Sequence, residues 1–110
     1  MSNQTRWAFN FQCDLTLDDI CTTFNTNGPY HWDVRENYIF GDYLNSRPED
    51  GLRLRVHFFP QAFVQNKSGF SALLELDQDS PRTQDAIDNT FRKLLTQIQA
   101  RDIKPVEPYD

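Results

Sequence analysis

The sequence contains only two cysteines, Cys13 and Cys21, which stand eight positions apart. This spacing differs from the Cys-x-x-Cys of redox and zinc motifs, and two cysteines cannot form the disulfide framework of a small secreted domain. Both positions fall within apolar patterns, where a thiol behaves as a small hydrophobic side chain. We therefore expect two buried structural thiols.

Glycine and histidine are also scarce, with four and two residues respectively. The glycines are widely scattered, which excludes the glycine-rich loops that bind phosphates through backbone N–H groups. The two histidines, His31 and His57, match neither the His-Glu-x-x-His motif nor the spacing of a zinc knuckle. The sequence thus predicts no bound metal and no cofactor.

No apolar run approaches the length of a membrane span, and the first residues lack the hydrophobic core of a signal peptide. We therefore predict a cytoplasmic protein that does not enter membranes. Basic residues are in the minority, since 11 Lys and Arg face 16 Asp and Glu and the net charge is −5. Nucleic-acid affinity depends on neutralising phosphates with Lys and Arg, so this balance argues against a DNA or RNA partner.

Aromatic side chains, by contrast, are abundant: they make up 14% of the chain and include nine Phe. Each large ring buries much apolar area, and a chain of 110 residues is close to the commonest domain size. We therefore predict one domain over residues 1–110, with a Phe-rich core that needs no metal or disulfide for support.

Alternating apolar and polar residues predict strands over residues 7–13, 52–59 and 70–77. Residues 30–44 fit either a strand with a bulge or a loop followed by a strand from Tyr38 to Leu44. A turn over residues 45–51, with Pro48 and Gly51 at favoured type I positions, should join this region to the next strand as a hairpin.

Two stretches have the helical spacing of apolar residues. The first begins after Thr16, which stands three residues before Asp19 in a capping-box pattern, and it ends at Gly28, where we expect a left-handed cap. The second begins with Ser80 as N-cap and Pro81 in the first helical position. Its apolar stripe comprises Ile87, Phe91, Leu94, Leu95 and Ile98.

Together these elements predict an α+β two-layer sandwich, in which a mostly antiparallel sheet of about four strands carries two helices on one face. The expected order is strand, helix, three strands and helix, and a short C-terminal strand is an open alternative. Residues 103–110, which contain Pro105 and Pro108, form either an extended edge segment or a frayed tail.

The most regular strand pattern, over residues 52–59, also predicts a cationic strip. One face of this strand is apolar, and the other carries Arg53, Arg55, His57 and Phe59. Three interpretations are open: the strip pairs with acids across strands, it holds an anion or ligand, or His57 acts in acid–base catalysis. In the last case the orienting carboxylate is Asp33, Glu36 or Asp42.

A second candidate is the aromatic segment that precedes this strand. Tyr and Trp are enriched in interface hot spots, because each joins an apolar ring to a polar atom. The residues concerned are Tyr30, His31, Trp32, Tyr38, Phe40 and Tyr43.

We hypothesise a small non-enzymatic module that binds another protein through an open sheet face and the aromatic segment, as an acidic inhibitor of a basic partner would. The expected binding residues are Arg53, Arg55, His57, Phe59, Tyr30, His31, Trp32, Tyr38 and Tyr43. The alternative is a small-molecule or anion-binding protein, or a small enzyme that uses His57 or His31. A homodimer formed through the sheet is a third interpretation.

Overall fold

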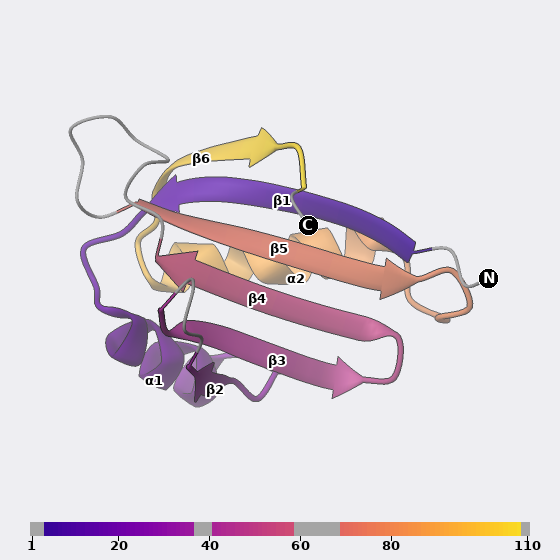
Figure 1. The fold of residues 1–110 in the computed structure, drawn as a ribbon, viewed down its shortest axis with the longest axis horizontal. Coiled ribbons are helices and arrows are strands. Elements are labelled where there is room, and N and C mark those ends of the chain that lie inside the picture. Colours follow the sequence, from indigo (N-terminus) through magenta and orange to yellow (C-terminus); the bar gives the residue numbers. More distant parts are fainter. Residues whose placement is uncertain (1–3, 37–40, 59–68, 109–110) are drawn as a thin grey trace.

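A six-stranded antiparallel sheet and two helices make up the computed structural model, which describes residues 4–36, 41–58 and 69–108 (Figure 1). The strands lie in the order β2-β3-β4-β5-β1-β6, and each neighbouring pair is antiparallel. Along the chain the elements are β1 (Gln4–Gln12), α1 (Leu17–Asn27), β2 (Asp33–Arg35), β3 (Tyr43–Glu49), β4 (Leu52–Phe58), β5 (Gly69–Asp77), α2 (Gln84–Gln97) and β6 (Arg101–Val106).

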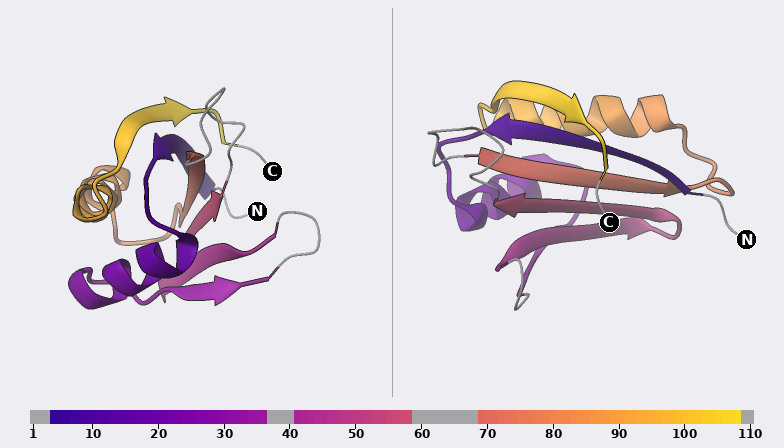
Figure 2. Two further views of the ribbon diagram at one scale, coloured as in Figure 1. Left: turned by 90° about the vertical axis from the view of Figure 1, so that its left-hand side faces the viewer. Right: turned by 45° about the horizontal axis from the view of Figure 1, so that its top comes forward.

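The predicted α+β class is confirmed, whereas the prediction of about four strands is too low, since the sheet has six. The two additional strands are the edges of the sheet. β2 is only three residues long and pairs with β3, and β6 pairs with β1. Most of the C-terminal segment therefore lies extended beside the first strand. Figure 2 shows both helices on the same side of the sheet.

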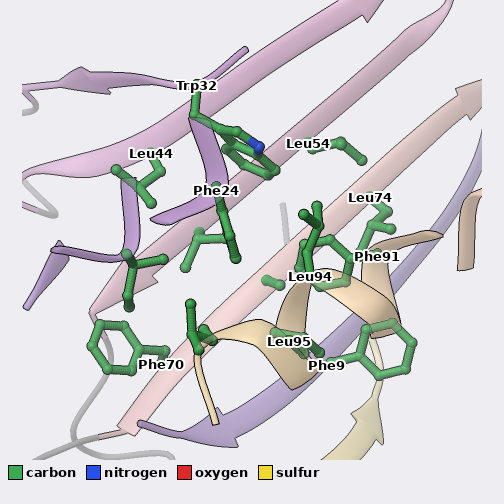
Figure 3. Close-up of a cluster of buried hydrophobic side chains, with 14 of the residues drawn as sticks. Phe9, Phe24, Trp32, Leu44, Leu54, Phe70, Leu74, Phe91, Leu94 and Leu95 are labelled. Carbon is green, nitrogen blue, oxygen red and sulfur yellow. The ribbon is translucent and has the colours of Figure 1, made fainter. Parts of the chain in front are cut away.

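Apolar side chains between the sheet and the helices form one buried cluster (Figure 3). The strands contribute alternate residues, such as Phe9 from β1 and Leu74 from β5, because successive side chains of a strand point to opposite faces. The helix α2 contributes its whole predicted stripe, since Ile87, Phe91, Leu94, Leu95 and Ile98 are all buried. The rings of Phe9 and Phe91 stack with their centroids 6.2 Å apart. The core thus lies where the apolar periodicity of the sequence predicts it.

The hairpin expected around residues 45–51 is confirmed, but the turn itself is shorter than predicted, because β3 continues through most of this stretch to Glu49. Only Asp50 and Gly51 form the turn, and Gly51 has φ +87°, which favours glycine. An Asp-Gly pair is well suited to a two-residue hairpin turn. Pro48 is exposed and lies where the pairing with β4 is irregular, so its missing N–H does not interrupt the ladder.

The expected start of α2 at Ser80 and Pro81 is wrong, because the helix begins at Gln84 with Thr83 as N-cap. The Thr83 hydroxyl accepts a hydrogen bond from the backbone N–H of Ala86 at 3.2 Å. Ser80 instead accepts one from the N–H of Arg82, within the preceding loop. Both residues can cap a helix, and the structure uses the later one.

At the other helix, the predicted N-cap is confirmed but the C-terminal geometry is not. The Thr16 hydroxyl accepts a hydrogen bond from the N–H of Asp19, as expected. Gly28, however, has an extended backbone with φ −98° rather than a left-handed one. Glycine is required there for space, because a Cβ would overlap Cδ2 of Leu94 and lie 2.8 Å from the carbonyl oxygen of Phe24.

Replacing Gly28 with alanine is therefore expected to lower the free energy of unfolding by about 2 kcal/mol, because α1 and α2 must move apart to admit the methyl group. Urea unfolding followed by circular dichroism measures this change. Asn27→Ala is the matched control, since Asn27 is exposed beside Gly28 and should change stability by less than about 0.5 kcal/mol. Equal stability of the Gly28→Ala variant and the parent would contradict the close helix contact.

Candidate binding surface

The face of the sheet turned away from the helices carries a cluster of charged side chains from three adjacent strands. We call it the arginine face and define it by Arg6 of β1, Arg53 and Arg55 of β4, and Glu75 of β5. The register brings them together, because Glu75 pairs with Arg6 on one side and with Arg53 on the other. Residues directly opposite each other point to the same face, so Arg6, Glu75 and Arg53 form one row, and Arg55 lies on the same face two residues along β4.

Glu75 is the carboxylate at the centre of this row. Its Oε1 accepts a hydrogen bond from Nη2 of Arg55 at 2.8 Å, and its Oε2 lies 3.6 Å from Nε of Arg6. The Glu75 side chain is only 11% exposed, so the pairing is screened less by solvent than a surface salt bridge. Three guanidinium groups thus surround one carboxylate, and this face is locally cationic on a chain whose net charge is −5.

Arg53 is the arginine that the row leaves without a partner. Across residues 4–36, 41–58 and 69–108, no carboxylate lies within ion-pair distance of its guanidinium, and its buried Nε makes no hydrogen bond. Burial, and then the positive charge of Arg55, lowers the pKa of Arg53. The free protein therefore holds this cation in an unfavourable position that an added anion would improve.

An open pocket of about 360 Å³ lies at the hairpin end of the arginine face. Strand β3, the turn, β4 and β5 all contribute to its lining, which consists of Arg47, Glu49, Asp50, Gly51, Leu52, Arg53, Glu75 and Asp77. Oε1 of Glu49 accepts a hydrogen bond from Nε of Arg82 at 2.8 Å, so this carboxylate is already neutralised. Arg47 is exposed at the same pocket.

The opposite end of this face is closed to solvent. His57 is 9% exposed, and its neighbours Ser71, Leu73 and Ala8 are each 1% exposed. Figure 2 shows β6 and the β2–β3 pair extending from the two edges toward the side away from the helices, which makes this face concave. Of the strip expected from the sequence, Arg53 and Arg55 are accessible in part, His57 is buried, and Phe59 lies outside the described residues.

His57 was expected as part of a cationic strip, but its side chain is not a cation at neutral pH. Its ring stacks on Tyr43 with centroids 5.0 Å apart and an interplanar angle of 21°. Burial, and secondarily the charge of Arg55, lowers the pKa of His57 from 6.5 to about 4. At neutral pH the imidazole is uncharged, and it packs as an aromatic side chain.

This shift predicts a loss of stability in acid. The pKa of His57 is about 4 in the folded state and near 6.5 in the unfolded chain, so between these values the unfolded state binds more protons. Stability therefore falls as the pH drops from 6.5 toward 4. Urea unfolding across this range should show a flatter profile in the His57→Gln variant. The matched control is His31→Gln, and a profile flattened in the control rather than in His57→Gln would contradict the assignment.

Trp32, expected as an exposed contact, is a core residue with 1% of its surface exposed. Its ring packs 5.0 Å from that of Phe24 and 6.4 Å from that of Phe91 (Figure 3). Asn25 holds the backbone of Trp32 from α1, because its Oδ1 accepts from the Trp32 N–H at 2.7 Å and its Nδ2 donates to the Trp32 carbonyl at 3.0 Å. The tryptophan is thereby fixed beneath the helices.

The rest of the aromatic segment is dispersed. His31 is exposed, and its Nε2 lies 3.2 Å from Oδ1 of Asp33. Tyr30 is half-buried, whereas Tyr43 lies on the concave face against His57. Tyr38 and Phe40 fall outside the described residues. The described members therefore do not gather into one aromatic surface.

Sequence reasoning missed Arg6, Arg47 and Glu75 as members of the site. The strand pattern alone places Glu75 on the polar face of its strand. No local signal, however, indicates that β1 pairs with β5 so that Arg6 meets Glu75, more than 60 residues along the chain.

The remaining groups of interest are the two thiols and the side chains that can bind metal ions. Cys13 and Cys21 are buried as expected, and burial raises the pKa of each thiol. Within the described part of the chain, no three His, Cys, Asp or Glu side chains gather closely enough to hold a metal ion. The helices of this part are too short or too polar to cross a membrane.

Comparison with known proteins gives no family assignment. No model of a known protein family matches the chain, and a search of curated protein sequences finds no significant match.

Proposed function

We propose that this chain is a non-enzymatic binding module that receives another protein at the hairpin end of the arginine face. The observation that carries the proposal is Arg53, a partly buried guanidinium that no described carboxylate pairs with, at the edge of an open pocket. Arginine is enriched in protein interfaces, where its planar group makes several directed hydrogen bonds. Arginine side chains at the pocket also help to orient the partner as it approaches.

The protonation properties of the candidate catalytic groups support a binding role over an enzymatic one. A general base works best when its pKa lies near the working pH, and the pKa of His57 is about 4. Nucleophilic thiols have lowered pKa values, whereas burial raises those of Cys13 and Cys21. We propose a cytoplasmic partner, because two buried thiols that form no disulfide suit a reducing compartment.

The proposal is tested by comparing the proteins captured by the parent chain with those captured by Arg53→Glu, using quantitative mass spectrometry. We expect the recovery of the specific partner to fall at least about tenfold, because a favourable charge contact becomes a repulsive one. Lys93→Glu is the matched control, since it makes the same change of charge on the exposed surface of α2. Unchanged recovery of every captured protein with Arg53→Glu would contradict the proposal.

Two further measurements complete this test. Thermal unfolding of Arg53→Glu separates a lost contact from a lost fold, and Arg53→Gln provides a milder variant. Sedimentation velocity of the parent chain shows whether the partner is a second copy of itself. The second candidate function is the binding of a free small anion in the same pocket, which the same variants test.

A further inference from the structure

Arg47 and Arg53 line the hairpin pocket as two guanidinium groups that no carboxylate of the described residues neutralises. We infer that this pocket binds a carboxylate presented by an acidic segment of the partner protein. This inference rests on the proposed function and names the chemistry of its contact.

Two of the four carboxylates in the pocket lining, Glu49 and Glu75, are paired with other arginines. Glu75 pairs with Arg55 at 2.8 Å and lies 3.6 Å from Arg6. Glu49 pairs with Arg82 at 2.8 Å. The lining therefore combines two arginines, two carboxylates that are paired with other arginines, and the further acids Asp50 and Asp77.

A second feature is that the pocket is held in shape by the sheet. The backbone N–H of Asp77 donates to the carbonyl of Gly51 at 2.7 Å, which ties the hairpin turn to the end of β5. Arg53 lies on β4, at a paired position opposite Glu75. A binding group on a regular strand is positioned more precisely than one on a loop, so less ordering is needed when the ligand binds.

The acids in the lining favour a carboxylate over a phosphate as the bound group. Asp50 and Asp77 lie in the same lining, and they would repel a doubly charged phosphate more strongly than a singly charged carboxylate. Phosphate sites commonly use the N-terminus of a helix, whereas the residues lining this pocket come from strands and the hairpin turn. Each arginine can donate two parallel hydrogen bonds to a carboxylate.

The openness of the pocket favours a protein segment over a free molecule as the source of the carboxylate. Ion pairs in contact with solvent contribute little free energy by themselves. Affinity must then come from contacts around the pocket, and a free small mono- or dicarboxylate is too small to make them. A peptide that places one carboxylate at Arg53 can extend along the exposed hairpin and the adjoining part of the arginine face.

The inference is tested by titrating the isotopically labelled chain with a hexaglutamate peptide and following the Nε–H signals of the arginines by NMR. We expect saturable shifts of the Arg47 and Arg53 signals. In the Arg53→Gln variant the affinity for hexaglutamate should fall about tenfold or more, because a charged hydrogen bond is removed. Lys93→Gln is the matched control and should bind as the parent does. Parallel titrations use free glutarate and inorganic phosphate.

Several results would overturn the inference. These are saturation by phosphate with no shift from hexaglutamate, glutarate binding as tightly as the peptide, and equal affinity of the parent and Arg53→Gln for hexaglutamate. Failure of the two proposals is distinguishable. If partner capture depends on Arg53 while hexaglutamate does not bind, only the carboxylate inference fails. If hexaglutamate binds at Arg53 while every captured protein is retained by Arg53→Glu, the proposed function fails.

Discussion

Replacing Trp32 with alanine is expected to lower the free energy of unfolding by about 4 kcal/mol, because a large ring is removed from a closed core. The ring is 1% exposed and lies between Phe24 and Phe91. The space that it leaves is bordered by two helices and the sheet, which cannot all close around it. Urea unfolding followed by circular dichroism measures the loss.

Trp32→Phe is the conservative counterpart. Phenylalanine keeps an aromatic contact with Phe24 and removes the indole Nε1, a buried donor with no hydrogen-bond acceptor among residues 4–36, 41–58 and 69–108. We therefore expect this variant to lose only about 1 kcal/mol and to retain partner binding. If instead Trp32→Ala kept the parent's stability but lost the partner, Trp32 would be an exposed contact, as its sequence context suggested.

Replacing Glu75 with glutamine is expected to lower the free energy of unfolding by about 3 kcal/mol, because it leaves the partly buried guanidinium groups of Arg6 and Arg55 without their shared carboxylate. The remaining cations repel one another across adjacent strands. Added salt should restore part of the loss, since mobile anions screen this repulsion. Chemical unfolding in urea at low and high NaCl concentration measures both effects.

Two controls make this result specific. Asp79→Asn removes one negative charge from an exposed turn and should change stability by less than about 0.5 kcal/mol. The double variant Glu75→Gln with Arg53→Gln should be more stable than Glu75→Gln alone, because one of the repelling cations is removed. Identical stability of the Glu75→Gln variant and the parent would show that the row of charges contributes nothing to the fold.

The same substitution also affects the proposed contact. Glu75 lines the pocket and competes with any incoming carboxylate for the arginines. The Glu75→Gln variant should therefore bind hexaglutamate more tightly than the parent, although its fold is less stable. Opposite changes in stability and affinity are typical of a binding site whose charges are not optimised for the free protein.

The parts of the fold that the sequence predicted well depend on local periodicity. The alternation of Leu52, Leu54 and Val56 and the helical spacing of Ile87, Phe91 and Leu94 each reflect one buried face, and all six residues are buried. The Thr16 cap likewise depends on residues within one helical turn. In such cases the physical cause lies within a few residues of its effect.

The errors arose where neighbouring signals compete or where distant strands meet. Ser80 and Thr83 are both good caps, and Pro48 is compatible with a turn or with an irregular part of a strand. Tryptophan is a common residue in contact surfaces, but Trp32 is buried because α1 and α2 pack over it. The meeting of Arg6 with Glu75 depends on strand order, which no local pattern encodes.

The position of β1 has a consequence for how the chain is made. β1 lies between β5 and β6, whose residues all follow it by more than 55 positions, so its partners are synthesised long after it. β3, β4 and β5 are consecutive neighbours and can pair in the order of their synthesis. β1, which carries Phe9 and Phe11, cannot pair with β5 until β5 has been synthesised. Of the six described strands, β1 is therefore synthesised before the others but is among the last to be paired, and its apolar side chains can take part in aggregation until then.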